Sequence, residues 1–281
     1  MEKGTDYMPN LENENIEIKC LTEAIYQKYG YDFRGYAWDS LKRRVIDILK
    51  EMKSENISQM QHQVLYDKSF FLLILSKLTI NVTQMFRDPD FYSKLRKIVF
   101  PRFKEYPFIK IWLAGCSTGE EAYSIAIALK EEGLYEKSQI YATDISIPVL
   151  EKAKQGIYSA GVMKEYTNNY RKGGGKKSFS EYYTAKYDHA IMDKTLHENI
   201  NFADHNLATD TSFGLMDIIL CRNVFIYFTR SLQTRVLRLF NDSMDKGGIL
   251  CMGSQENIMY TEEATNYFEK LCSDESIYIK K

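Results

Sequence analysis

The sequence predicts an α/β protein in which a mostly parallel sheet follows a smaller all-helical domain. Apolar residues recur at helical spacing through the first part of the chain, and short apolar runs alternate with helical patterns from residue 109 onward. Strands that alternate with helices favour a parallel sheet with helices on both of its faces. We therefore expect an N-terminal helical domain over residues 1–90 and a larger α/β domain over residues 91–281.

Helical periodicity is clear near the N-terminus. Ile18, Leu21 and Ile25 lie three and four residues apart, and Gly30 is a typical residue at which a helix ends. Asp39 can cap a second helix in which apolar residues share one face. These patterns predict helices over residues 16–29, 41–52, 70–78 and 89–103.

The predicted sheet consists of short apolar runs, and each of the first three precedes a helical pattern. The runs cover residues 109–114, 139–143, 216–221, 248–253 and 276–279, and the helical patterns cover 120–129, 148–154 and 231–244. Three adjacent glycines at residues 173–175, flanked by lysines and an arginine, interrupt this alternation. Such a segment is either a mobile surface loop or a module that docks a partner, and the sequence does not choose between them.

Composition and charge argue against several classes of protein. The formal net charge of -1 over 281 residues argues against a nucleic-acid partner. The five cysteines lie far apart and lack C-x-x-C spacing, so we expect reduced thiols and no metal site. We find no secretory signal and no apolar run of the roughly 20 residues that cross a bilayer. We therefore expect a cytoplasmic protein without membrane insertion, whose oligomeric state stays open.

Gly115 and Gly119 bound a loop where a predicted strand passes into a helix. Glycines let a ligand approach the backbone closely, and the N–H groups at a helix start favour anionic groups. Asp144 ends the next strand, at a typical distance for a carboxylate that binds ribose hydroxyls. Either feature alone also suits a tight turn or a helix cap. Together they indicate a cofactor that contains adenosine, without saying which one.

Five motifs occur in order along the chain. They are T-I-N-V-T-Q-M-F-R-D at residues 79–88, G-C-S-T-G-E-E-A-Y-S at 115–124, A-T-D-I at 142–145, N-L at 206–207 and C-R-N-V-F-I-Y-F at 221–228. Over nearly the whole chain they resemble the CheR-type chemotaxis receptor methyltransferases. The resemblance implies methyl transfer from S-adenosylmethionine to glutamate side chains of other proteins, with S-adenosylhomocysteine as the product. It also implies a class I S-adenosylmethionine-dependent methyltransferase (Rossmann-like) sheet with a small inserted antiparallel β subdomain, here at about residues 165–203.

The resemblance also implies roles for particular residues. Tyr227 is the implied catalytic residue and would face the methyl group. The residues implied to bind the cofactor are Asn81, Thr83, Arg87, Glu121, Asp144, Asn206, Leu207, Arg222 and Asn223. Each also has a purely structural interpretation, such as a helix cap or an ion pair. Met85 and Ala122 depart from the family's common residues, and the family's arginine between the two domains could be Arg96 or Arg102.

The implied chemistry needs little machinery. A glutamate carboxylate has a pKa of about 4.3, so it is already a nucleophile at neutral pH and needs no general base. Alignment of the reacting atoms and exclusion of water can then supply much of the rate. The Tyr227 hydroxyl can orient the carboxylate oxygen by a hydrogen bond.

The implied partner is a methyl-accepting chemotaxis receptor or a related signalling protein. Lys42, Arg43 and Arg44 form a candidate contact for an acidic receptor segment, although a solvated helix face suits them equally. The chain could instead bind S-adenosylmethionine as a sensor, or dock in a signalling complex, without turnover. A sensor would bind labelled cofactor and transfer nothing, which separates the two interpretations. The identity of the methylated protein stays open.

Overall fold

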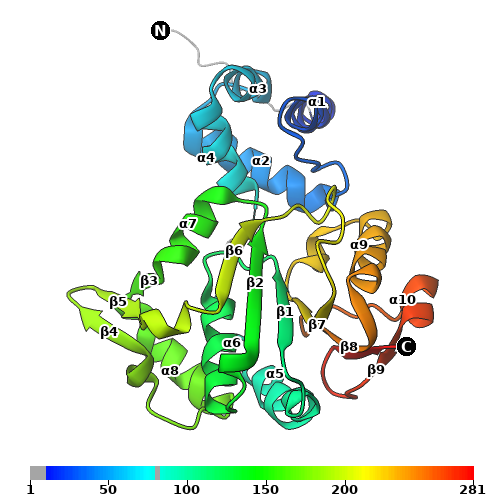
Figure 1. Cartoon of the computed structure of the whole chain (residues 1–281). Coiled ribbons are helices and arrows are strands. Elements are labelled where there is room, and N and C mark those ends of the chain that lie inside the picture. Colours follow the sequence, from blue (N-terminus) through cyan, green and yellow to red (C-terminus); the bar gives the residue numbers. More distant parts are fainter. Residues whose placement is uncertain (1–10, 80–82) are drawn as a thin grey trace, which may run out of the picture. The chain divides into compact units, whose positions relative to one another are not determined.

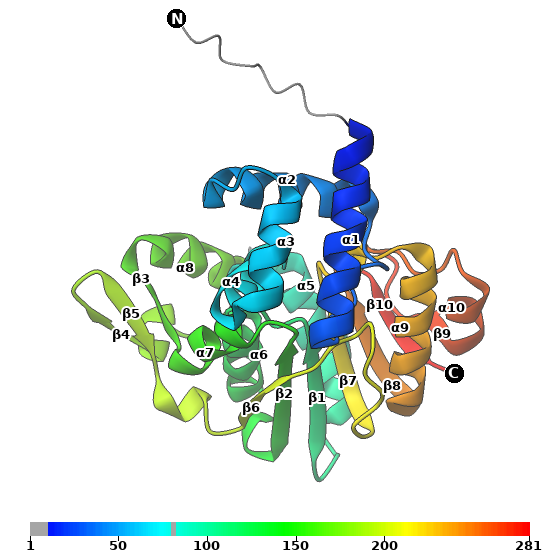
Figure 2. The ribbon, with the colours of Figure 1, turned by 90° about the horizontal axis from the view of Figure 1, so that it is seen from above.

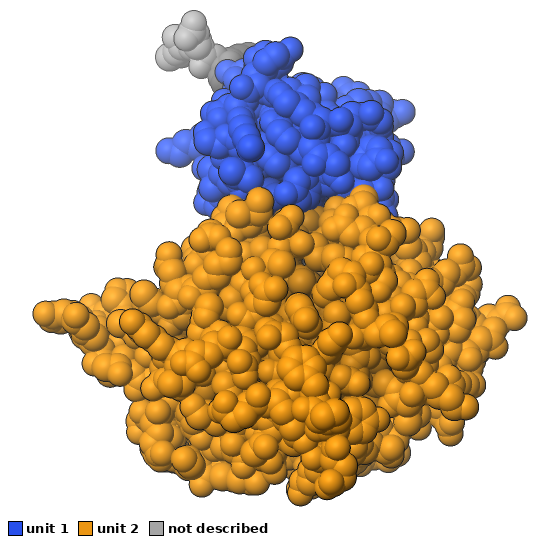
Figure 3. Space-filling model, in the orientation of Figure 1, with its two compact units in different colours: residues 1–79 blue, residues 80–281 orange. Residues whose placement is uncertain are grey.

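The computed structural model describes residues 11–79 and 83–281. Contacts divide the chain into two compact units, residues 1–79 and residues 80–281 (Figure 3). The division falls before helix α5 (Pro89–Lys94), whereas the predicted boundary lies near residue 90. The reason is that α5 packs against helix α8 (Met163–Lys172) of the second unit.

The described part of the first unit contains four helices. They are α1 (Leu11–Tyr29), α2 (Trp38–Met52), α3 (Ile57–Tyr66) and α4 (Lys68–Leu78). Their apolar faces share one core, in which Tyr29 stacks on Phe71 with ring centres 3.7 Å apart. Helix α3 lies outside the predicted helices, although Ile57, Met60 and Val64 recur at helical spacing and are all buried.

The basic residues of α2 do not form one cationic surface. Arg44 is buried, and its guanidinium donates to the carbonyl of Leu78 and, at 3.0 Å, to the hydroxyl of Ser40. Lys42 lies 3.6 Å from the carboxylate of Glu14. Arg44 therefore braces the first unit from inside, and residues 42–44 do not present three cations to a partner.

The second unit (Figure 1) is built on a seven-stranded sheet with the order β6-β2-β1-β7-β8-β10-β9, whose strands are labelled in Figure 2. Strands β6, β2, β1, β7 and β8 are parallel, whereas β10 runs antiparallel to both β8 and β9. The strands are β1 (Ile109–Ala114), β2 (Ser138–Asp144), β6 (Ile200–Asp204), β7 (Met216–Cys221), β8 (Met244–Met252), β9 (Phe268–Lys270) and β10 (Ile277–Lys280). The predicted α/β class with a mostly parallel sheet is confirmed.

Helices cover both faces of this sheet. Alternate side chains of a strand point to opposite faces, so one strand packs against helices on both sides. Ile111 and Leu113 of β1 are buried in the core that includes helix α6. Trp112, between them, packs on Phe240 of helix α9 with ring centres 5.5 Å apart. Helix α10 lies beside α9 (Figure 2). The helices are α6 (Glu120–Glu131), α7 (Ile147–Gln155), α9 (Arg230–Asp242) and α10 (Glu262–Tyr267).

A small antiparallel sheet is inserted between β2 and β6, as predicted. Its order is β3-β5-β4, with β3 (Ile157–Ser159), β4 (Tyr183–Lys186) and β5 (His189–Met192). The first strand begins before the predicted start near residue 165, because β3 precedes α8 while β4 and β5 follow it. The predicted methyltransferase-type fold, with a helical N-terminal part and this insertion, is confirmed.

The glycine-rich segment after α8 is anchored to the C-terminal end of α6. The backbone N–H of Lys176 donates to Glu131 at 3.1 Å, and its ammonium group lies 2.8 Å from the carboxylate of Glu132. A Cβ atom on Gly175 would lie 2.2 Å from the ring of Tyr170, which is fully buried. These contacts attach the segment to α6 and to the buried Tyr170 ring.

Within residues 11–79 and 83–281, no helix is both long and apolar enough to cross a membrane. The same residues contain no group of three or more histidine, cysteine or acidic side chains arranged to hold a metal ion. All five cysteines are free thiols, and four of them are buried.

We predict that Gly175→Ala destabilises the protein. The added methyl group would force the buried Tyr170 ring to move, and overpacking of this kind costs about 1–3 kcal/mol. Gly161→Ala is the matched control, because the nearest atom to its new Cβ would be a serine hydroxyl oxygen at 3.5 Å. Urea denaturation measures both changes. Equal free energies of unfolding for the two variants would contradict the packing role of Gly175.

Candidate active site

The candidate site lies where the strand order of the sheet changes direction, beside β1. Chain segments that follow β1, β2, β7 and β8 meet at the carboxyl ends of these parallel strands. Ligands of open α/β sheets bind at this edge. Six of the nine predicted cofactor residues, and Tyr227, follow or end one of these strands or the adjacent β6.

The loop after β1 requires its two glycines. Gly115 has a φ of +89°, and a Cβ atom there would lie 2.5 Å from Cγ2 of Val224. Gly119 has a φ of +92°, and its Cβ atom would lie 2.9 Å from the Cβ atom of Ala153. Close packing against the chain itself therefore excludes a side chain at both positions. This is a second reason for glycine, besides the close approach of a ligand that the sequence indicated.

Asp144, the last residue of β2, holds this loop in place. Its two carboxylate oxygens accept backbone N–H groups from Ser117, at 2.9 Å, and from Ser146, at 3.0 Å. Burial raises the pKa of Asp144, and the backbone donors oppose that rise. The Ile145 N–H is a third backbone donor to this carboxylate. A carboxylate has about four acceptor positions, so it keeps room for a further donor.

Two buried hydroxyls beside the Asp144 carboxylate have no hydrogen-bond partner among the described residues. They belong to Ser117 and Ser146, whose backbone N–H groups donate to that carboxylate. The Nδ1 atom of His205 also lacks a partner among these residues, but the His205 ring packs against Trp112 and Phe213. Buried polar groups normally have partners. The site therefore fits a ligand part with several hydroxyl groups, such as a ribose.

A second cluster is centred on the buried guanidinium of Arg222. It donates to Glu121 at 2.6 Å and to Asp88 at 2.9 Å. A further bond at 3.1 Å reaches the carbonyl of Arg87, and the guanidinium lies 4.0 Å from the ring centre of Phe91. The arrangement joins the end of β7 to the start of α6 and to the segment before α5. Arg222 therefore pairs with two carboxylates at once.

Glu256 is a residue of this site that the sequence did not reveal. It is buried, with 4% of its surface exposed, and its carboxylate accepts backbone N–H groups of Asn223 at 2.8 Å and Ile226 at 3.1 Å. It also accepts from Gly253 at 2.7 Å. Asn223 adopts a φ of +60°, which this carboxylate stabilises. Glu256 therefore shapes the turn that leads to Tyr227, and the only signal in the sequence is an acidic residue shortly after a predicted strand.

The structure places the other predicted residues as follows. Thr83 and Arg87 are half-buried on the segment before α5, and Asn81 lies outside the described residues. After β6, Asn206 accepts the N–H of Ala208 at 3.0 Å and Leu207 is buried. Tyr227 is half-buried in the short turn (Phe225–Tyr227) between β7 and α9.

The two arginines considered for the family's linker arginine both lie away from the glycine loop. Arg96 is buried in ion pairs with Glu131, at 2.6 Å, and Glu132, at 3.0 Å. These carboxylates belong to the C-terminal end of α6, whereas the glycine loop adjoins its N-terminal end. Arg102 is exposed on the turn that precedes β1, at the opposite end of that strand. Neither arginine is placed to assist at the carboxyl edge of the sheet.

We predict a pH-dependent stability that originates at Glu120, the first residue of α6. Burial raises the pKa of this carboxyl to about 7. Its contribution to stability is therefore full below its unfolded pKa of about 4.3 and falls as pH rises through about 7, by up to about 3 kcal/mol. Glu120→Gln should remove this loss, so the variant gains stability relative to the wild type between pH of about 5 and about 8.

Urea denaturation at pH of about 5 and of about 8 measures the free energy of unfolding of both proteins. Glu165→Gln, at an exposed position on α8, serves as the control and should keep the wild-type pH dependence. If Glu120→Gln and wild type lose stability in parallel as pH rises, the assignment to Glu120 is wrong.

Two family models match the chain, and together they cover most of it. Residues 16–79 match the all-alpha domain of CheR methyltransferases, and residues 81–276 match their SAM binding domain. A Pseudomonas putida protein named "Putative methyltransferase Cher3" is 48% identical over 97% of this chain and 100% of its own length.

Two further relatives are more distant. The Listeria innocua "Chemotaxis protein methyltransferase" is 30% identical over 90% of this chain and 93% of its own length. The Escherichia coli "Chemotaxis protein methyltransferase" is 28% identical over 88% of this chain and 86% of its own length. This chain belongs to the CheR methyltransferase family, and its cofactor is S-adenosylmethionine.

Proposed function

We propose that the protein transfers the methyl group of S-adenosylmethionine to glutamate carboxylates of a methyl-accepting chemoreceptor or related signalling protein, forming glutamate methyl esters. The observation that carries this proposal is the meeting of three features at one sheet edge. They are the Asp144-braced glycine loop, the Arg222 cluster with its two carboxylates, and Tyr227. Two relatives named as chemotaxis protein methyltransferases support the same class of substrate.

The adenosine part of the cofactor would bind at the loop. Asp144 keeps acceptor capacity for a ribose hydroxyl, and the hydroxyls of Ser117 and Ser146 lie unpartnered beside it. Asn206 and Leu207, which follow β6, would border the adenine. The glycine loop is already held in shape by Asp144, so binding costs little reorganisation.

The Arg222 cluster would bind the amino acid part of the cofactor. The carboxylates of Glu121 and Asp88 would attract the ammonium group of this part of the cofactor. Arg87 and Asn223 adjoin the same cluster and turn, and we include them, with Thr83 and Asn81, among the residues that line this part of the site.

The hydrogen bonding of the Arg222 cluster favours a carboxylate as the methyl acceptor. S-adenosylmethionine supplies an electrophilic methyl group when it is bound. Glu121 and Asp88 are both engaged by Arg222, so these carboxylates are poorly placed to take a proton from an amine or alcohol. A glutamate carboxylate needs no such base because it is ionised at neutral pH. Tyr227 would orient its attacking oxygen, and Glu256 would hold the turn that carries Tyr227.

We further propose that the protein acts in the cytoplasm. Its five cysteines are free thiols, as expected for a reducing compartment. The acceptor glutamates would then lie in a cytoplasmic segment of the receptor.

The direct test is methyl transfer from tritiated S-adenosylmethionine to proteins of the source organism. Glutamate methyl esters are hydrolysed by mild alkali, so the label should be released as volatile methanol. Label that resists alkali would point to a different acceptor. Stoichiometric cofactor binding without transfer would favour a sensor or docking protein.

We predict that Asp144→Asn weakens binding of S-adenosylhomocysteine by about tenfold or more. The change keeps the side-chain size but removes a charged acceptor, and hydrogen bonds to charged groups contribute about 1.5–3 kcal/mol. Isothermal titration measures the dissociation constant, and thermal denaturation checks that the variant is folded. Asp188→Asn, at an exposed hairpin position, is the control. An unchanged dissociation constant in Asp144→Asn would show that the Asp144 carboxylate does not bind the ribose hydroxyls.

We predict that Tyr227→Phe lowers the turnover number by roughly a hundredfold while cofactor affinity stays constant. Loss of one oriented donor in the transition state has an effect of this order. Initial rates of alkali-labile methyl transfer measure it. Tyr187→Phe, in which the replaced side chain is 91% exposed on a hairpin, should transfer at the wild-type rate. A fully active Tyr227→Phe variant would show that the hydroxyl does not orient the carboxylate.

A further inference from the structure

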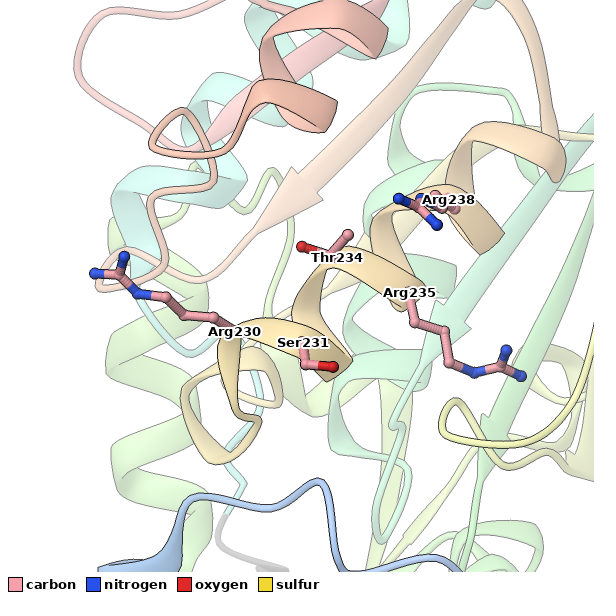
Figure 4. A pocket seen from close by; sticks show the side chains of 5 residues that line it. All are labelled: Arg230, Ser231, Thr234, Arg235 and Arg238. Carbon is pink, nitrogen blue, oxygen red and sulfur yellow. The ribbon is translucent and has the colours of Figure 1, made fainter.

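Helix α9 presents a cationic face to the surface of the second unit. Arg230 and Arg235 extend from opposite sides of the helix, with Ser231 and Thr234 between them and Arg238 on the next turn (Figure 4). These five residues line a pocket of about 550 Å³. We call this set the α9 basic face.

The helix separates its apolar and cationic residues. Leu232, Val236 and Phe240 are buried toward the sheet, while the three arginines are exposed. Arg230 is the first residue of the helix, and its first turn contains no acidic residue. A cation at a helix N-terminus opposes the helix dipole. The helix dipole therefore does not favour an arginine at position 230, whereas a role in binding would.

The charge of the α9 basic face is largely uncompensated. Arg235 donates to the backbone carbonyls of Ala208, at 2.6 Å, and Asp210, at 3.1 Å, which are neutral acceptors. Arg230 lies 5.4 Å from the ring centre of Tyr260. Among the ion pairs of the described residues, neither Arg230 nor Arg235 takes part. Only Arg238 has a carboxylate partner, which is Glu263 at 3.1 Å.

The α9 basic face begins next to the proposed reaction site. Tyr227 precedes Arg230 by three residues, so their Cα atoms are separated by at most about 11 Å. From Arg230 to Arg238 the helix extends by about 12 Å along its axis. A chain that places a glutamate at Tyr227 can therefore reach Arg230 within about four residues and follow the helix from there.

We propose that the α9 basic face binds an acidic segment of the substrate protein that adjoins the methylated glutamate. The proposal rests on the proposed function and adds a specificity element to it, because substrates with carboxylates beside the target would be preferred. Complementary charge also speeds the association of the two proteins and fixes how the acidic segment aligns along the helix. A nucleic-acid ligand suits the face less well, because the whole chain carries a formal net charge of -1.

The test compares Arg230→Glu/Arg238→Glu with wild type and with Arg102→Glu. Arg235 is left intact because it braces the loop after β6. Arg102 is an exposed arginine at the opposite end of β1, so its reversal matches the chemistry without touching the α9 basic face. The first probe is a short fluorescein-labelled peptide with one glutamate flanked by aspartates, and its counterpart has asparagines in place of the aspartates. Fluorescence polarisation at low and high salt gives the affinities.

We expect wild type and Arg102→Glu to bind the aspartate peptide alike, and the double variant to bind it about tenfold more weakly. The asparagine peptide should not distinguish the three proteins. In the transfer assay the double variant should show a raised KM for the protein substrate with kcat and cofactor affinity unchanged. Equal peptide affinity in all three proteins would overturn the proposal. So would tighter binding of a labelled RNA oligonucleotide than of the aspartate peptide.

The two proposals fail in different ways. If wild type transfers alkali-labile methyl groups while the double variant keeps the wild-type KM, the α9 basic face is not the docking surface and the proposed function stands. If the double variant alone loses the aspartate peptide while wild type transfers no methyl group, the α9 basic face binds acidic segments and the proposed function is wrong.

Discussion

A single buried guanidinium connects the parts of the candidate site. Arg222 follows β7, and its hydrogen bonds reach Glu121 at the start of α6 and both Asp88 and the carbonyl of Arg87 on the segment before α5. These segments are far apart in the sequence, and Arg222 joins them together with the bond from the Phe86 N–H to the Ser124 hydroxyl at 2.9 Å. Removing a buried charge from such a cluster leaves its partners unpaired, which costs about 3–5 kcal/mol.

Elsewhere in the site, buried carboxylates hold the backbone turns in place. Asp144 fixes the glycine loop through the N–H groups of Ser117 and Ser146. Glu256 fixes the turn after β7 through the N–H groups of Asn223 and Ile226. Each carboxylate loses its hydrogen bonds to water on burial and accepts hydrogen bonds from backbone N–H groups in their place. A site held in this way is shaped before a ligand binds, as electrostatic catalysis requires.

Much of the fold could be predicted from the sequence, because apolar periodicity reports which face of an element is buried. The strands at 109–114 and 216–221 and the order of strands and helices follow from it directly. Helix α3 was missed although its buried residues are regularly spaced. The glycine segment at 173–175 was open to two interpretations, because the contacts of Lys176 with Glu131 and Glu132 join residues more than 40 positions apart.

The candidate site was predictable only where its residues form local motifs. The glycine loop and Asp144 occur at a characteristic spacing, so their proximity could be inferred before the structure was known. Glu256 could not be found in this way, because its role depends on a turn 30 residues earlier in the chain. The pairing of Arg222 with Glu121 spans 101 residues and has no local signal. Long-range pairing of polar groups is what the sequence alone leaves undetermined.

A crystal structure of the protein with S-adenosylhomocysteine would test the central claim most directly. The account predicts that the ribose hydroxyls bind the Asp144 carboxylate, that the amino acid part lies against the Arg222 cluster, and that the sulfur atom faces Tyr227. A ligand bound elsewhere, or one whose sulfur points away from Tyr227 and the start of α9, would contradict the account.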